Sequence, residues 1–201
     1  MMLKEYRLHA LIPKMWFDIP WFRESLKHMR NMNLSPVKGI KVRHYVEVLS
    51  DCESDMVNLP DAGQIADWVN DALVETGGEV SEVSVKLVSA REMADLNKEY
   101  RQRSDATNVL SFPMNVESET GHPLLGDIAV CPAVVIAEAK EQDKSLEAHF
   151  AHMLVHGVLH LQGHNHKGDE EAEKMEQIEV AILRTMGFPN PYMTPAKRHK
   201  K

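Results

Sequence analysis

The sequence predicts an α/β or α+β layer fold, because strand-like and helix-like segments follow one another from Tyr45 onward. YVEVL at Tyr45 and VSVKLV over Val83–Val88 alternate apolar and other side chains, as strands do. Between them, apolar residues instead recur at the spacing of a helix: Ile65, Trp68, Val69, Ala72 and Leu73. We therefore expect a sheet covered by helices.

The boundaries of the elements in the first half of this region are marked by capping and turn residues. Asp61 opens the first helix, and Gly77-Gly78 ends it. Ser89 with Glu92 three residues later forms a capping box, which starts a helix towards Tyr100. The following segment RQRSDAT is interpreted as a polar loop.

The next segments predict two strands and three helices. NVLSF is a short strand stopped by Pro113, and LLGDIAVC is another strand. Pro132 begins a helix that runs to about Gln142. Ser145 caps the helix LEAHFAHMLVHGVLHLQ, which Gly163 terminates, and a last amphipathic helix runs from about Asp169 to Met186. Its expected buried face consists of Ala172, Met175, Ile178 and Ile182.

Composition indicates one globular domain in a reducing compartment. The chain has 201 residues, of which 43% are hydrophobic and 26% charged. Its two cysteines, Cys52 and Cys131, lie far apart and indicate neither a disulfide framework nor a thiolate metal site. The apolar runs are far shorter than the roughly 18 residues of a membrane span. We expect a cytoplasmic protein with no membrane association.

The charge balance does not favour nucleic acid as a partner. The formal net charge is -7 and the sequence pI is near 5.9, so RNA would need a local basic patch. One basic segment is the tail over residues 193–201, which contains KRHKK and is read either as a contact to RNA or ribosome or as a disordered solubilising tail.

Residues 1–43 differ from the rest of the chain in their clustered aromatics and the basic run KGIKVRH. One interpretation is an arm that docks to a partner. The interpretation we favour is an extension without a role, disordered or upstream of the true start, for which Met29 and Met32 are candidates. The predicted organisation is therefore an extension over 1–43, a domain over 44–192 and a tail over 193–201.

The segment HGVLHLQGHNH has the spacing of a metal site. His156 and His160 are four residues apart on the predicted helix, so they project side by side. Gly163 allows the chain to fold back, which brings His166 towards the pair as a third ligand. Three protein ligands leave one tetrahedral position for water, as in catalytic zinc sites. We predict one Zn²⁺ per chain, held by these three histidines.

Other histidines in this region receive different predictions. His152 and His149 lie one and two turns before His156, so we assign them a supporting or substrate-facing role, and predict His152 as a substrate-binding residue. His164 and Asn165 lie within the return turn, where turn chemistry is favoured over ligation.

Two further observations bear on the chemistry. The spacing is also that of metzincin peptidases, but Gly157 replaces the glutamate that acts there as general base, so a zinc peptidase is an alternative with less support. In EYRQRSDATNVLSFP, Arg101 is predicted to bind phosphate, because guanidinium groups form forked hydrogen bonds with phosphate oxygens. Arg103 is interpreted as part of a solvated loop.

Taken together, HGVLHLQGHNH, YRQRSDATNVLSFP and LLGDIAV resemble the YbeY family of bacterial zinc-dependent endoribonucleases, over about Tyr45–Tyr192. The family pattern is close to H-G-x-L-H-L-x-G-Y/H-D-H, so Asn165 departs from the usual aspartate. The departure affects tuning of the site rather than its ligands.

The resemblance implies a mixed, mostly parallel four-stranded sheet covered by helices, with the metal at the end of a cleft. It also implies cleavage of single-stranded rRNA, at the 3′ end of the small-subunit rRNA, in association with the ribosome and its quality control. Arg101 and His156 are then the catalytic residues, and Arg101 also binds substrate. A non-catalytic zinc-containing ribosome assembly factor is a further alternative.

The proton acceptor is left open by the sequence. His152, His164 and Asp127 are candidates, and attack by the 2′-hydroxyl of the RNA itself is another route.

Overall fold

The computed structural model describes residues 43–50, 58–76, 80–118 and 121–193. The predicted extension over 1–43 and the basic tail therefore lie almost entirely outside the described residues, and the predicted domain division stays a prediction. Within the described ranges, no helix is both long and apolar enough to cross a membrane.

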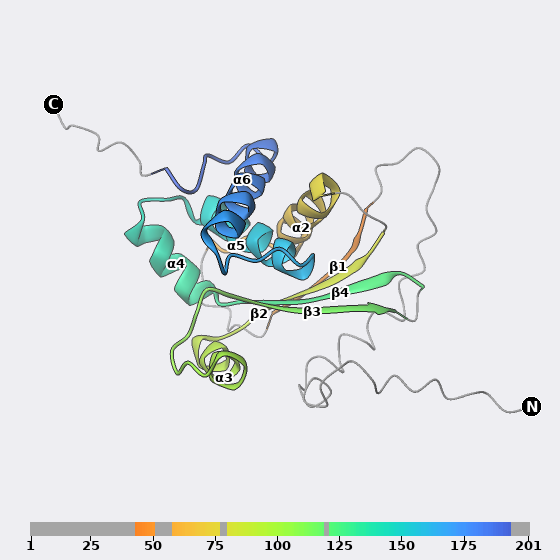
Figure 1. Cartoon of the computed structure of the whole chain (residues 1–201). Helices are drawn as coiled ribbons and strands as arrows, with labels where there is room; N and C mark the ends of the chain where they lie inside the picture. The colour runs from red at the N-terminus through yellow and green to blue at the C-terminus, as the bar shows by residue number, and fades with distance from the viewer. Residues whose placement is uncertain (1–42, 51–57, 77–79, 119–120, 194–201) are drawn as a thin grey trace, which may run out of the picture. The chain divides into compact units, whose positions relative to one another are not determined.

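A mixed sheet forms the centre of the described part of the chain (Figure 1). Its four strands lie in the order β1 (Tyr45–Ser50), β2 (Glu82–Leu87), β4 (Pro123–Val130) and β3 (Val109–Glu117). The pairs β1–β2 and β2–β4 are parallel, and β3 runs antiparallel to β4. This topology confirms the expected mixed, mostly parallel four-stranded sheet.

Five described helices cover the sheet: α2 (Ala62–Thr76), α3 (Ala90–Arg101), α4 (Pro132–Glu141), α5 (Leu146–Leu161) and α6 (Asp169–Thr185). Figure 1 shows α2, α5 and α6 on one side of the sheet and α3 on the other. The α/β fold class is thereby confirmed.

The alternation of side chains assigns each strand residue to one of the two faces. Val85 and Ile128 are fully buried in the core that includes Phe150 and Leu154 of α5. The next residue of β4 towards its start, Asp127, therefore lies on the face away from α5. This separation determines which polar groups can reach a site on α5.

The predicted caps are present. The Asp61 carboxylate accepts from the backbone N–H of Gln64 at 2.8 Å, and the Ser145 hydroxyl accepts from Ala148 at 3.2 Å. Ser89 accepts from the N–H of Glu92, but the Glu92 carboxylate accepts a 2.9 Å hydrogen bond from Lys86 of β2. The residues of the predicted capping box thus also tie α3 to the sheet.

The prediction that Pro113 stops the third strand was wrong, because β3 continues to Glu117. Proline lacks the N–H that a central strand must donate, but β3 lies at the edge of the described sheet. The pairing with β4 also shifts its register between Pro113 and Val116. An edge strand with an irregularity accommodates a proline that a central strand would not.

Two smaller predictions were also incorrect. Arg101, predicted in a loop, is the last residue of α3, and Gln102 follows it in the left-handed conformation with φ of 57°. On α6, Met175 and Ile182 are buried as predicted and Ile178 is half-buried against the core, whereas Ala172 is only half-buried. Glu179 on the same helix is also buried, at 1% exposure.

Candidate metal centre

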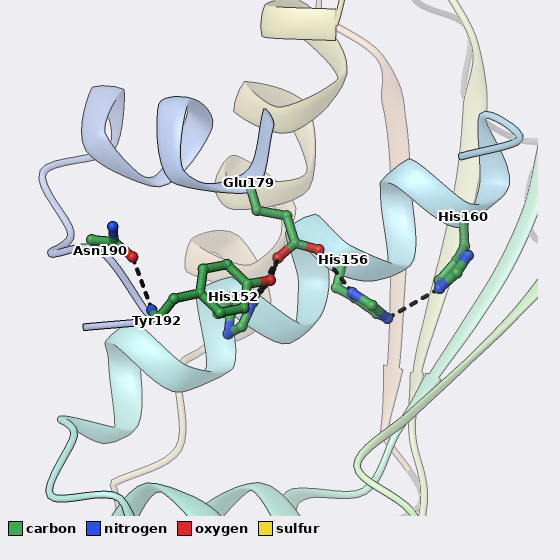
Figure 2. A network of polar contacts seen from close by, with 6 residues as sticks. All are labelled: His152, His156, His160, Glu179, Asn190 and Tyr192. Atoms are coloured by element: carbon green, nitrogen blue, oxygen red, sulfur yellow. Dashed lines mark hydrogen bonds and ion pairs between the residues drawn. The ribbon is translucent and has the colours of Figure 1, made fainter. Parts of the chain in front are cut away.

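The site is built on α5, a helix that is buried along most of its length. His156 and His160 are one turn apart, and both are half-buried near the end of the helix. Their Nε2 atoms face each other at 3.0 Å, with ring centroids 4.5 Å apart (Figure 2). The predicted pairing of these two side chains is therefore present in the structure.

The turn after α5 brings the third histidine to this pair. Gly163 has φ of +90°, in the left-handed region, and the N–H of His164 donates back to the carbonyl of Leu159 at 3.0 Å. The ring of His166 then lies 5.4 Å from that of His156 and 5.1 Å from that of His160. One ligand atom from each of the three histidines lies within 4.8 Å of the other two.

The hydrogen bonds on the far side of two rings make this arrangement suitable for a cation. The Nδ1–H of His156 donates to Glu179 at 2.8 Å, and the Nδ1–H of His160 donates to the carbonyl of His164 at 2.9 Å. In the neutral rings, both Nε2 atoms then carry lone pairs that point at each other. Two ligands of a tetrahedral zinc ion lie about 3.3 Å apart, close to the separation found here. His156 and His160 therefore have the spacing of two zinc ligands, and His166 offers a third ligand atom within 4.8 Å of both.

The electrostatic surroundings keep His160 neutral. Burial is the largest cause that lowers its pKa to about 4, followed by the charge of His156. His166 and Arg101 act in the same direction, and the hydrogen bond to the His164 carbonyl opposes them. A neutral imidazole is the form that binds a metal ion.

Glu179 of α6 is a residue of this site that the sequence analysis missed. One carboxylate oxygen accepts from His156 at 2.8 Å, and the other accepts from Nε2 of His152 at 2.9 Å and from the hydroxyl of Tyr192 (Figure 2). Burial alone would raise the pKa of Glu179, but these three hydrogen bonds outweigh burial and lower the pKa to about 2. Its position among apolar residues of an amphipathic helix was the signal that could have identified it.

His152 is buried, with 7% of its surface exposed, and its ring lies between Glu179 and Tyr192. His149 is also buried, and its Nε2 lies 2.8 Å from the carboxylate of Glu138 on α4. This geometry favours the supporting role for both histidines. It gives no support to the predicted contact of His152 with substrate.

Arg101 interacts electrostatically with His160, although it comes from a helix on the other side of the sheet. Its charge is among those that lower the pKa of His160, and its side chain is exposed. Burial of part of the guanidinium, together with the charge of Arg103, lowers the pKa of Arg101 from its usual value. The arginine that the sequence predicted to bind phosphate is therefore close enough to His160 to affect its charge.

Asp127, a candidate proton acceptor from the sequence, is on the face of the sheet away from α5. It is 3% exposed, and its carboxyl group is hydrogen-bonded to Ser84. Burial and the charge of Glu47 raise the pKa of Asp127 to about 8, against the opposing effect of Ser84. A carboxyl group beneath the sheet cannot take a proton at the histidines, so this candidate is withdrawn.

Gly157 has a structural role that explains why no glutamate follows His156. A Cβ atom at this position would lie 3.0 Å from Cγ2 of Ile128 and 3.3 Å from Oγ of Ser111. The helix therefore contacts the sheet at this residue, and a side chain here would point at β3 and β4 rather than into the metal site. The position that carries the general base of metzincin peptidases is filled here by helix–sheet packing.

The fold and the site define an α/β domain with three histidines arranged to hold one metal ion beside an exposed arginine. Comparison with known proteins gives the family. The model of the family described as endoribonuclease YbeY matches residues 51–187. A relative named Endoribonuclease YbeY, from Cellvibrio japonicus (strain Ueda107), is 49% identical over 134 residues, which are 67% of this chain and 76% of the relative. The chain belongs to the YbeY family.

A solved structure also matches. The solution structure of TM1509 from Thermotoga maritima covers 78% of this chain and 99% of its own, with 23% identity and a TM-score of 0.46.

Proposed function

We propose that this protein is a zinc-dependent endoribonuclease that cleaves single-stranded rRNA in the maturation of the small-subunit 3′ end. The printed name of the family and of its 49% identical relative supports cleavage within RNA chains. The observation that carries the proposal is the pair of Nε2 atoms of His156 and His160, facing each other at 3.0 Å while both Nδ1 atoms are engaged elsewhere. Because the proposed substrate is rRNA, the proposal includes association with the ribosome, a part in ribosome quality control and a cytoplasmic location.

His156, His160 and His166 are the proposed ligands of one zinc ion. Bound zinc supplies Lewis-acid chemistry, which polarises a phosphoryl oxygen and makes water a better nucleophile near neutral pH. Among the described residues, the group that could hold a metal ion consists of these three histidines, a donor set typical of catalytic rather than structural zinc sites.

Arg101 is the proposed binding group for the scissile phosphate. Its exposed guanidinium can donate two parallel hydrogen bonds to phosphate oxygens and stabilise the charge that develops on them. The partial burial of Arg101 strengthens such an interaction relative to one in water. His156 is catalytic in this proposal because it is a ligand of the ion.

The proton acceptor is limited by the geometry to fewer candidates. Asp127 is on the wrong face of the sheet, and the Nε2 of His152 is engaged with Glu179. His164 is half-buried in the turn beside the ligands and stays a candidate, as does attack by the RNA's own 2′-hydroxyl. A 2′,3′-cyclic phosphate at the 3′ end of the 5′ product indicates attack by the 2′-hydroxyl, whereas attack by water at the same bond leaves no cyclic phosphate.

Cleavage of purified rRNA with and without a chelator tests the proposal. We expect the wild-type protein to cleave only with metal, His156→Ala to lose both zinc and cleavage, and Arg101→Ala to retain zinc but lose about 100-fold or more in rate. Unchanged cleavage by Arg101→Ala would remove its assigned role.

The same preparation separates the alternatives. Hydrolysis of unstructured peptides would indicate a peptidase, which the packing of Gly157 disfavours. Binding to ribosomal subunits without cleavage of their RNA would indicate an assembly factor.

A further inference from the structure

We propose that Glu179 is a positioning residue that aims His156 at the metal, and that His152 and Tyr192 hold Glu179 in place for this purpose. The inference rests on the proposed function only in that it takes the three histidines as a metal site. It assigns a role to three residues on α5, α6 and the segment after α6, none of which is a ligand.

Glu179 contacts His156 directly. The carboxylate is 1% exposed and accepts from Nδ1 of His156 at 2.8 Å, whereas the His156 side chain is 24% exposed. An imidazole that is partly exposed can rotate and can carry its proton on either nitrogen. An ionised acceptor at Nδ1 fixes the proton there, so that Nε2 keeps its lone pair and points to His160.

Each of the two proposed ligands on α5 has its own acceptor for its Nδ1–H. For His160 this acceptor is the carbonyl of His164, which is part of the turn formed by Gly163. His156 lies one helical turn earlier on α5, so the carbonyl of His164 is too far away to accept from its Nδ1–H. A side chain from a neighbouring helix is then needed, and Glu179 of α6 provides it.

The other oxygen of Glu179 is held by two further side chains. It accepts from Nε2 of His152 at 2.9 Å and from the hydroxyl of Tyr192, whose ring lies 5.4 Å from the ring of His152 at an interplanar angle of 81°. The side chain of Asn190 accepts from the N–H of Tyr192 at 2.9 Å, which shapes the segment that returns this tyrosine to the site (Figure 2). The two hydrogen bonds from His152 and Tyr192 hold the buried carboxylate in one orientation, with its other oxygen on His156.

The histidines His152, His156 and His160 of α5 therefore have two different roles in this proposal. His156 and His160 present Nε2 to the metal, whereas His152 presents Nε2 to the carboxylate behind the metal. Chain positions that look equivalent in the sequence have opposite orientations towards Glu179.

The test compares zinc affinity by competition with a chromogenic chelator, using zinc ions alone as the probe. We expect Glu179→Gln to weaken zinc binding about 10- to 100-fold relative to the wild-type protein. The matched control is Glu173→Gln, because Glu173 is an exposed glutamate on the same helix, and we expect its affinity to equal that of the wild type. Equal affinity of folded Glu179→Gln and wild type would overturn the proposal.

A second readout separates positioning from folding. Nitrogen-15 NMR of the metal-free protein reports which ring nitrogen of His156 carries the proton. We expect a proton on Nδ1 in the wild type and a mixture of tautomers in Glu179→Gln. A role in folding alone would change the thermal midpoint and leave the tautomer as it is, and that result would also overturn the proposal.

Tyr192→Phe covers the case in which Glu179→Gln fails to fold. Tyr192 is 44% exposed, so the loss of its hydroxyl alone leaves the core intact, and we expect zinc binding several-fold weaker with a partly mixed His156 tautomer. Wild-type affinity together with the wild-type tautomer in this variant would contradict the role of the network. If the wild-type protein binds zinc but does not cleave RNA, the proposed function fails while these measurements still decide the role of Glu179.

Discussion

At the scale of the residue, side chains with the same chemistry serve different purposes according to what surrounds them. Glu179 and Asp127 are both carboxyl groups with almost no exposed surface. Glu179 accepts three hydrogen bonds, which lower its pKa to about 2, whereas burial and the charge of Glu47 raise the pKa of Asp127 to about 8. Glu179 is therefore ionised at neutral pH beside the proposed metal site. Asp127 is instead protonated in the interior of the domain.

The raised pKa of Asp127 predicts that this residue contributes a loss of stability as the pH rises from about 4 to about 8, opposed below pH 6.5 by His160, whose pKa is lowered. Between the unfolded value of 3.8 and the folded value of about 8, the unfolded chain releases a proton that the folded chain keeps. The contribution of Asp127 to the free energy of unfolding therefore falls through this window and levels off above it. Urea denaturation at pH 5 and pH 8.5 measures the difference.

We expect Asp127→Asn to remove most of this pH dependence, because the amide has the same shape and no proton to lose. Asp71→Asn is the control, since Asp71 is exposed on α2. A wild-type pH slope retained in Asp127→Asn would show that another group is responsible.

Gly157 gives a prediction about packing. A methyl group there meets the side chains of Ile128 at 3.0 Å and Ser111 at 3.3 Å, so these side chains must shift by a few tenths of an ångström. Alanine favours a helix over glycine by about 0.5–1 kcal/mol, and overpacking costs about 1–3 kcal/mol. We expect Gly157→Ala to lose about 1–2 kcal/mol of stability in chemical denaturation. A gain in stability would mean that the contact between α5 and the sheet is looser than described here.

At the scale of the element, the proposed metal site consists of the end of a helix together with the turn that stops it. α5 determines the spacing of His156 and His160, and the left-handed Gly163 determines the direction from which His166 returns. The same turn supplies the carbonyl of His164 that engages Nδ1 of His160. The same turn therefore both ends α5 and orients the proposed ligand His160.

Gly163→Ala tests this connection. No atom lies within 4 Å of the position where the new Cβ would be, so its cost comes from the φ of +90° rather than from a clash. We expect a loss of about 1–2 kcal/mol in stability and a weaker zinc affinity, because relief of the strain moves His164 and His166. Gly163→Asn is the matched variant, since asparagine tolerates the left-handed region better, and it should lose less of both. Denaturation and chelator competition measure the two effects, and equal losses in the two variants would contradict the role of backbone strain.

At the scale of the whole molecule, the proposed site joins segments that are distant in the sequence. His156 and His160 come from α5, Glu179 from α6, Tyr192 from the segment after it, and Arg101 from α3 across the sheet. A metal ion that binds the folded protein alone must therefore stabilise the domain by mass action.

Zinc at about 100 times its Kd should add about 2.7 kcal/mol of stability, which raises the thermal midpoint of a domain of this size by about 5–10 °C. A chelator should reverse the shift, and His156→Ala should show none. Differential scanning calorimetry at several zinc concentrations measures the shift. A midpoint independent of zinc would argue against the three-histidine site.

The sequence by itself determined the order of the elements, their caps and the metal-binding spacing. These features depend on residues near one another in the chain. Ser145 and Gly163 bracket α5, and residues four apart on a helix share a face whatever the helix packs against. The resemblance of three motifs added the family, and with it the expected sheet.

The tertiary structure alone decided the features that depend on neighbours from other elements. Pro113 is tolerated because β3 lies at the edge of the described sheet, and Asp127 is excluded from the site because β4 turns it away from α5. His152 differs from His156 because Glu179 reaches both rings from α6 with different oxygens. A helical spacing predicts which side chains share a face, but their orientation and protonation depend on the groups that a second helix places against them.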